Sequence, residues 1–213
     1  MYVSDTRLQR VAVFTAGGKF SHFIGSDSLL VAPVGMAFDG RGERLYVVDT
    51  RNHDVKVFDR DGRLIRILGK KGDGRGEFHY PVTVAISRGD TVYVVDAFHF
   101  AVQAFDASGQ FLFSFGHSNV GVGELARPRD IAIDSRGRLY ITDAMRNNVQ
   151  MYRSDGTFLI SFGDIGTGPG EFQLPAGICI SDNDTVYVVD SINKRIQMFA
   201  FAISETLERS KSE

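Results

Sequence analysis

Hydrophobic and polar residues alternate in short runs along most of this chain. The clearest copy of the pattern lies between Pro128 and Leu174, where four runs have the length of a strand. These runs are residues 129–133, 138–142, 149–152 and 157–162. Alternation with a period of two predicts antiparallel strands, and helical periodicity is absent from this region. Each copy is therefore expected to fold into four strands.

The turns between the runs carry residues that suit tight hairpins. In the clearest copy they are Asp134-Ser135-Arg136-Gly137 and Arg153-Ser154-Asp155-Gly156, and Asp59-Arg60-Asp61-Gly62 is similar in an earlier copy. Aspartate and serine side chains bond the local backbone, and glycine supplies positive φ angles. The pattern thus favours consecutive hairpins.

Two independent landmarks show that these copies form a repeat. An aspartate closes one apolar run in each copy, and successive aspartates are 44, 47, 47 and 47 residues apart. These aspartates are Asp5, Asp49, Asp96, Asp143 and Asp190. Four prolines, Pro33, Pro81, Pro128 and Pro175, keep the same phase. Four-stranded units at this period are typical of propeller blades. We predict an all-β fold, with a β-propeller at residues 1–199 as one domain and a polar C-terminal tail at 200–213.

The blades are expected to start near residues 1, 33, 81, 128 and 175. The chain opens in the second strand of a blade, at Met1–Asp5, and its last strand, residues 195–199, is the third of a blade. Three complete blades therefore lie between two partial ones. Because propellers remove their edges by closing into a ring, we expect a six-bladed ring. Its N-terminal portion, of about 60 residues at this repeat length, is expected upstream of Met1 or on a second chain.

Several motifs give the repeat a family resemblance. They include Pro175-Ala176-Gly177-Ile178, Val186-Tyr187-Val188-Val189-Asp190, Gly156-Thr157-Phe158-Leu159 and Gly168-Pro169-Gly170-Glu171-Phe172. With Asn193 and Ile196-Gln197-Met198-Phe199, they resemble the NHL repeat. The resemblance implies a six-bladed propeller, similar to bacterial proteins that normally carry an N-terminal export or lipoprotein signal. An extracytoplasmic location is therefore implied, although no signal peptide is read in this sequence.

Composition narrows the range of functions. The formal net charge of −2 argues against a dedicated polyanion binder. The single cysteine, Cys179, excludes an intramolecular disulfide framework. No apolar run reaches the length needed to span a membrane. Composition therefore assigns no chemistry to the repeat domain.

The recurring polar residues favour structural roles. The five repeat aspartates are expected to accept N–H bonds in the turns that follow them, since a catalytic carboxylate is not needed once per blade. The glycine clusters at residues 72–76 and 166–170 lack the strand and helix context of a phosphate-binding loop. Asp130, the one acid among small inner-strand residues, is expected to pair with a neighbour rather than bind a cation. Cys179 replaces an alanine there and is expected to fill space.

Four histidines support an enzymatic alternative. His53, His79, His99 and His117 are all predicted in loops on one face of the propeller. Imidazoles that converge there could hold a metal. The alternative function is therefore a metal-assisted lyase or hydrolase at the channel mouth, and the distances between the imidazoles discriminate it from a binding module.

Loop aromatics carry the preferred hypothesis. Phe98 and Phe100 flank His99 and are expected at positions that are mostly polar or charged in the other blades: Asn52 and His53, Arg146 and Asn147, and Asn193 and Lys194. Exposed aromatic residues are frequent anchors of protein interfaces. We predict a non-enzymatic scaffold that binds a protein through its loop face and needs no cofactor. The candidate contact residues are Phe98, His99, Phe100, Arg51, His53, Tyr80 and Arg146. RNA binding is a second alternative, because basic residues slightly outnumber acidic ones on that face.

Overall fold

Each blade is an antiparallel sheet whose strands follow one another in chain order. The computed structural model describes residues 1–25, 28–117 and 121–200, and its eighteen strands in those ranges form five sheets. Blade one contains β1 (Tyr2–Asp5), β2 (Arg10–Phe14) and β3 (Phe20–Ile24). Blade two contains β4 (Pro33–Phe38), β5 (Arg44–Asp49), β6 (Asp54–Asp59) and β7 (Leu64–Leu68). Blade three contains β8 (Pro81–Ile86), β9 (Val92–Asp96), β10 (Ala101–Phe105) and β11 (Phe111–Phe115).

The remaining two blades complete the series. Blade four contains β12 (Pro128–Ile133), β13 (Leu139–Asp143), β14 (Asn148–Tyr152) and β15 (Phe158–Phe162). Blade five contains β16 (Pro175–Ile180), β17 (Val186–Asp190) and β18 (Arg195–Phe199). The all-β propeller prediction is confirmed, with three four-stranded and two three-stranded blades. The predicted tail at 200–213 falls, beyond Ala200, outside the described residues.

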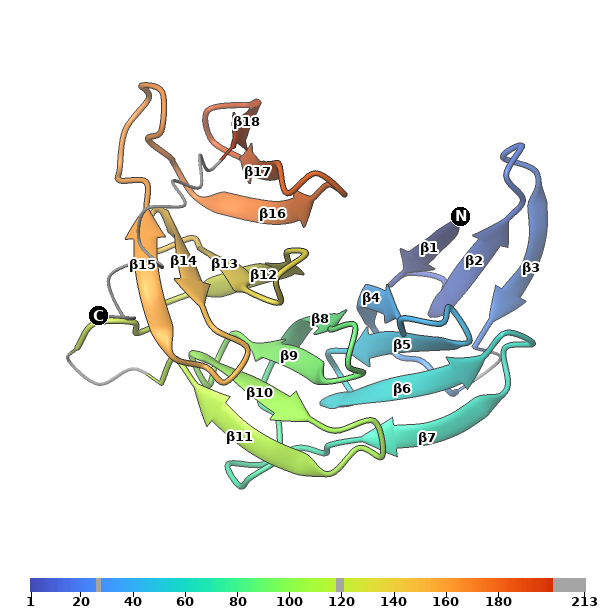
Figure 1. Ribbon diagram of the computed structural model, residues 1–213. Helices are drawn as coiled ribbons and strands as arrows, with labels where there is room; N and C mark the ends of the chain where they lie inside the picture. Colours follow the sequence, from blue (N-terminus) through green and yellow to red (C-terminus); the bar gives the residue numbers. More distant parts are fainter. Residues whose placement is uncertain (26–27, 118–120, 201–213) are drawn as a thin grey trace, which may run out of the picture.

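The blades stand around a common centre, with β4, β8, β12 and β16 innermost (Figure 1). Large side chains of one blade pack on those of the next: Tyr46 and Val48 of blade two share a core with Val92 and Val94 of blade three. The inner strands β4 and β8 approach closely because Gly35 carries no side chain. A Cβ atom on Gly35 would lie 2.5 Å from the Cα atom of Thr83, so β4 and β8 require glycine there.

The five blades form an open arc, with blade one and blade five at its two ends (Figure 1). In blade five, at one end of the arc, apolar side chains are exposed that are buried in blade four. Ile196 and Met198 on β18 are 64% and 67% exposed, whereas the equivalent Val149 and Met151 of blade four are 0% and 4% exposed. On blade one, Val3, Phe20 and Phe23 are also exposed. Within residues 1–25, 28–117 and 121–200, no strand covers these two apolar sheet faces, and the sixth blade expected from the sequence is not among the described residues.

Strand order places the loops at two opposite ends of the sheets. The loops between second and third strands, together with the linkers between blades, lie at one end, which we name the loop face. The hairpins between first and second strands lie at the other end, the hairpin face. None of the described residues forms a helix that is long and apolar enough to span a membrane.

Candidate binding surface on the loop face

The repeat aspartates organise the loop face. Asp49, Asp96, Asp143 and Asp190 are fully buried, and each accepts backbone N–H bonds from the linker that precedes its own blade. Asp96 and Asp143 also accept N–H bonds from the loops that follow them, as does the partly exposed Asp5. The sequence predicted the bonds from the following turns but not those from the linkers, because the linker bonds join residues 16 to 18 positions apart.

Blade three carries an unusual partner for its aspartate. In blades two and five, Asn52 and Asn193 donate a side-chain N–H to the repeat aspartate at 2.8 and 2.9 Å. His99 occupies the equivalent position, and its Nδ1 lies 2.9 Å from Oδ2 of Asp96. The imidazole thus makes the bond that asparagine makes elsewhere and directs its second nitrogen, Nε2, away from Asp96.

That second nitrogen meets two other groups. The His99 and His79 rings are stacked, with centroids 4.3 Å apart. Oδ1 of Asp73 lies 2.9 Å from Nε2 of His79 and 3.4 Å from Nε2 of His99. The sequence offered no signal for Asp73, which lies in the glycine-rich linker between blades two and three.

The imidazoles of the other two histidines bond groups outside the Asp73, His79 and His99 side-chain cluster. His53 Nδ1 bonds the backbone carbonyl of His79 at 2.7 Å, and His117 Nε2 bonds Ser114 Oγ at 2.8 Å. His117 and His99 both line a cleft of about 300 Å³. Among the four predicted histidines, the described structure therefore brings His79 and His99 into metal-binding distance of each other, with Asp73 as the third group.

Beside the histidine pair lies an aromatic pair. The Phe98 and Tyr80 rings are stacked with centroids 4.6 Å apart, and they are 62% and 41% exposed. Phe100 is 39% exposed and has a φ angle of 54°, in the left-handed region. Of the remaining candidates, Arg51 is exposed and Arg146 forms an ion pair with Glu124 at 3.6 Å.

The strand register shows that the expectation of polar equivalents for Phe98 is wrong in blades four and five. Counting from the repeat aspartate, its equivalents are Arg51, Met145 and Ile192, not the polar residues that follow them. Met145 and Ile192 are 69% and 56% exposed. Blades three, four and five therefore all present an exposed apolar side chain at the same place, and the apolar character extends beyond blade three.

Asp130 has a structural role near the centre. Its carboxylate accepts bonds from the Thr83 hydroxyl at 3.1 Å and from the backbone N–H of Ile178 at 3.0 Å. Burial raises the pKa of this carboxyl group, and the hydrogen bonds from Ile178, Ile131 and Thr83 partly offset that effect. Asp130 thus connects the inner strands of blades three, four and five.

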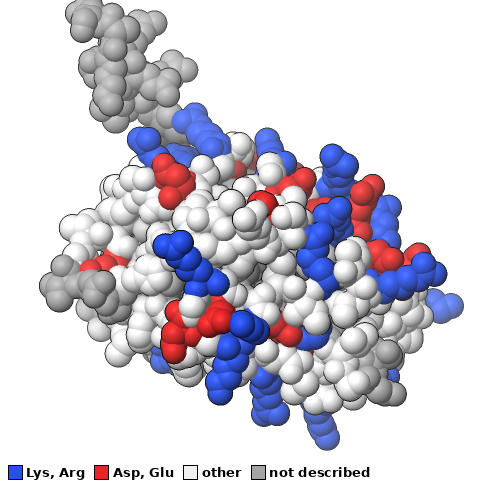
Figure 2. All heavy atoms as spheres, turned by 90° about the horizontal axis from the view of Figure 1, so that it is seen from below, with Lys and Arg blue, Asp and Glu red and all other residues white. Residues whose placement is uncertain are grey.

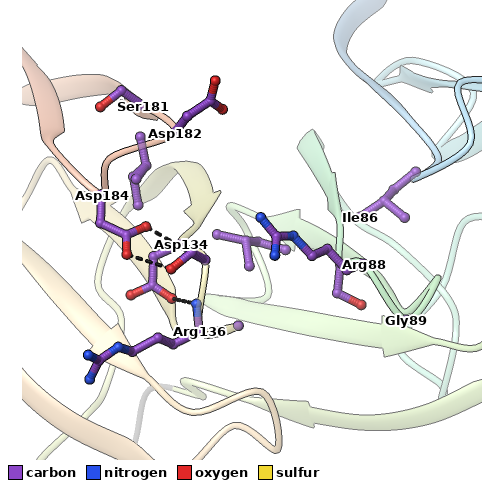
Figure 3. A pocket seen from close by; sticks show the side chains of 13 residues that line it. Ile86, Arg88, Gly89, Asp134, Arg136, Ser181, Asp182 and Asp184 are labelled. Atoms are coloured by element: carbon purple, nitrogen blue, oxygen red, sulfur yellow. Dashed lines mark hydrogen bonds between the residues drawn. The ribbon is translucent and has the colours of Figure 1, made fainter.

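The hairpin face holds a cleft of about 360 Å³ between blades three, four and five. Figure 3 shows Arg88 extending from blade three toward the side of the cleft that carries Asp134, Arg136 and Asp184. Asp184 is already bonded to the backbone N–H and hydroxyl of Ser135, which lowers the pKa of its carboxyl group. Asp134 accepts bonds from Arg138 and Tyr140. Both carboxylates therefore stabilise turns.

Charged side chains of both signs lie on the rim of the propeller. Figure 2, which views the molecule from the side of β7 and β11, shows basic side chains interspersed with acidic ones. The face in this view carries no continuous basic track.

The chain resembles known proteins in both sequence and structure. It is 36% identical over 66 residues to the human E3 ubiquitin-protein ligase NHLRC1, a match covering 31% of this chain and 17% of the ligase. It is 30% identical over 69 residues to NHL repeat-containing protein 2 of Gallus gallus, covering 31% of this chain and 10% of that protein. The chain thus matches only a small part of these relatives.

Solved propellers share the fold over most of the chain. Virginiamycin B lyase from Staphylococcus aureus matches with a TM-score of 0.68 and 12% identity, over 95% of this chain and 66% of the lyase. At this identity the likeness establishes the fold alone. A family model described as SMP-30/Gluconolactonase/LRE-like region matches residues 35–212. Together with the NHL-repeat relatives, this match shows that the chain belongs to the SMP-30/gluconolactonase/LRE-like family of β-propellers, with repeats of the NHL type.

Proposed function

We propose that this propeller is a non-enzymatic binding module whose loop face contacts a protein partner. The observation that carries the proposal is the exposure of Phe98, Met145 and Ile192 at one repeat position of three consecutive blades. Solvent-exposed apolar side chains that lie on one face are characteristic of interaction sites. Tyr80 and Leu174, 41% and 44% exposed, extend this apolar surface along the linkers.

The stacked ring pair provides an anchor of defined shape. Aromatic side chains bury a large area for little loss of side-chain entropy, and they dominate the energetics of many interfaces. Because Tyr80 holds the Phe98 ring from one side, a partner meets a pre-oriented surface. Arg51, His53, His99, Phe100 and Arg146 surround this centre as polar and aromatic contacts.

Site-specific cross-linking tests the location of the interface. A photoreactive amino acid is introduced at Phe98, Met145 or Ile192 and, as a control on the hairpin face, at Arg136. We expect the three loop-face positions to capture the same protein, which mass spectrometry identifies, and Arg136 not to capture it. Capture from Arg136 alone would contradict the proposal, and capture of RNA at the loop face would favour the RNA-binding alternative.

We further propose that a sixth blade, from polypeptide outside residues 1–213, covers the free faces of blades one and five. The apolar residues Ile196, Met198 and Phe23, all exposed, support this completion. The intact mass of the natural protein, purified from its source, tests it. A mass well above 23.5 kDa, or a stable second chain, is expected. A monomer of 23.5 kDa would contradict the proposal.

Metal-assisted lyase or hydrolase chemistry is the second candidate function. It is favoured by the convergence of Asp73, His79 and His99, and by the fold shared with virginiamycin B lyase. Lyase turnover of virginiamycin B that depends on added divalent metal would support it. No turnover by a metal-loaded protein would count against it.

A further inference from the structure

We propose that Asp73, His79 and His99 form a binding site for a divalent transition metal, with Zn²⁺ the expected ion. The three potential ligand atoms all lie within 4.8 Å of one another. This inference concerns the linker between blades two and three and does not depend on the proposed protein interface.

The spacing of the ligand atoms suits a tetrahedral ion. Zn–N and Zn–O distances near 2.0–2.2 Å place neighbouring ligand atoms about 3.4 Å apart. Oδ1 of Asp73 lies 2.9 Å from His79 Nε2 and 3.4 Å from His99 Nε2. Both Asp73 distances are near this value, and the two imidazoles, now stacked with an interplanar angle of 19°, would rotate out of the stack to direct both Nε2 atoms at one ion. Two imidazoles and one carboxylate are a ligand set that zinc accepts, with the fourth position left open.

Asp96 prepares both histidines for this role. Its buried carboxylate accepts the backbone N–H of His79 at 2.7 Å and lies 2.9 Å from Nδ1 of His99. An ionised carboxylate can only accept hydrogen bonds, so Nδ1 of His99 carries the proton. In the neutral imidazole with this tautomer, Nε2 carries the lone pair that a metal ion would accept. A carboxylate behind a ligating histidine fixes the tautomer and orientation of the ring, as metal sites require.

Blade five has a linker with the same backbone conformation but without the three potential metal ligands. The linker into blade five has the same backbone design: Glu171 accepts the N–H of Gly168 at 2.8 Å, as Glu77 accepts that of Gly74 at 2.9 Å. Gly72 and Gly166 have φ angles of 154° and 159°. Yet the three ligand positions of blade three correspond in blade five to Thr167, Gln173 and Asn193. The potential ligands are therefore not required by the loop.

The comparison with blade five also explains why the Asp73, His79 and His99 cluster is open to a cleft on one side. In blade five, Arg195 fills the space over the linker and donates to the carbonyls of Thr167 and Gly168 at 2.8 and 2.7 Å. Blade three has Ala101 at this position, and a cleft of about 300 Å³ lies there, lined by Asp73, His99, Arg75 and His117. A water molecule or an anion thus has access to the fourth coordination position, with Arg75 suited to an anion.

Blade five also supplies the matched variants. The full chain is freed of metal with a chelator and titrated with ZnCl₂ by isothermal calorimetry. We expect one Zn²⁺ per chain, and an affinity at least tenfold lower in the Asp73→Thr/His79→Gln/His99→Asn variant. His22→Gln, a histidine on blade one that bonds Ser21, is the control and should bind as the wild type does.

Two further measurements keep the test decisive. Circular dichroism should show a native spectrum for the triple variant, and His99→Asn alone, which retains the bond to Asp96, should also lose at least tenfold in affinity. Co²⁺ in place of Zn²⁺ should give the intense visible absorption of four-coordinate cobalt in the wild type only. Unchanged zinc affinity in the triple variant, or no binding to the wild type up to about 1 mM Zn²⁺, would overturn the proposal.

Discussion

The Phe98 ring stacks on the Tyr80 ring with an interplanar angle of 22° and a centroid separation of 4.6 Å. The two residues belong to different segments, since Tyr80 ends the linker before β8 and Phe98 lies in the loop after β9. Asp96 holds both segments through the backbone N–H groups of Tyr80 and Phe98, at 2.8 and 3.3 Å. One buried carboxylate therefore sets the geometry of the exposed aromatic pair.

Removing the ring of Tyr80 should leave the fold intact and disturb the surface. We expect Tyr80→Ala to lower the free energy of unfolding by only about 1 kcal/mol, because the stacked pair is largely exposed. Affinity for a cross-linked partner should fall at least tenfold. Urea denaturation and calorimetry check these outcomes. A loss of stability above about 3 kcal/mol would show that the pair is structural.

Phe100 should limit stability at its position. Its φ angle of 54° matches those of His53, Asn147 and Lys194, at 56°, 53° and 54°, in the equivalent loops. A bulky residue is unfavourable in this region, and asparagine tolerates it better. We expect Phe100→Asn to raise the free energy of unfolding by roughly 0.5–1 kcal/mol in urea denaturation. If the variant is less stable than the wild type, the Phe100 ring must contribute packing that outweighs backbone strain.

Acid should weaken the protein through Asp49. Burial raises the pKa of its carboxyl group, but N–H bonds from Val31 and Ala32 and the ammonium of Lys56 outweigh that effect, so the pKa is lowered. A lowered pKa contributes stability above the unfolded-state value, near 3.8, which is lost as the pH falls through the folded-state pKa.

The variant Asp49→Asn measures this contribution. It should be less stable than the wild type by about 2–3 kcal/mol at pH 7, because two buried N–H groups and Lys56 lose an ionised acceptor. The difference between the two proteins should shrink as the pH falls from 5 to 3, as followed by urea denaturation at each pH. A difference that does not change with pH would contradict the lowered pKa.

The open end of the arc should tolerate polar residues that a packed blade does not. Ile196→Ser is expected to change the free energy of unfolding of this chain by less than about 0.5 kcal/mol, since the side chain is 64% exposed. The matched variant Val149→Ser, at the fully buried equivalent position of blade four, should cost about 2–4 kcal/mol. Equal losses in urea denaturation would mean that β18 is covered in solution.

Local pattern was sufficient to predict most of the fold. The predicted strand at 195–199 coincides with β18, and those at 129–133, 138–142, 149–152 and 157–162 match β12 to β15 to within one residue at each end. The first strand of each complete blade begins at a proline of the repeat. Alternation and turn chemistry are short-range signals that a repeat presents several times, so errors in one copy are corrected by the others. The count of blades in the ring depends instead on closure, which no local pattern records.

The functional residues of the loop face were harder to predict from the sequence, because their contacts join segments that are distant along the chain. Asp73 and His99 are 26 residues apart, and their proximity depends on how the glycine-rich linker crosses from blade two to blade three. Aligning the loops from the repeat aspartate would have revealed Met145 and Ile192 as equivalents of Phe98. It would also have aligned His99 with Asn52 and Asn193. His99 differs from these asparagines in having a second ring nitrogen that can bind a metal.

The claim that the loop face binds a protein is tested most directly by the affinity of one surface variant for the partner identified by cross-linking. Phe98, Met145 and Ile192 are all replaced by arginine, the residue that blade two carries as Arg51. The control replaces three rim residues of comparable character, Ile65, Leu112 and Leu159, which are 45%, 47% and 37% exposed. We predict that calorimetry shows at least a hundredfold loss of affinity for the loop-face variant and none for the rim variant. Unchanged binding by the loop-face variant would contradict the assignment of the interface.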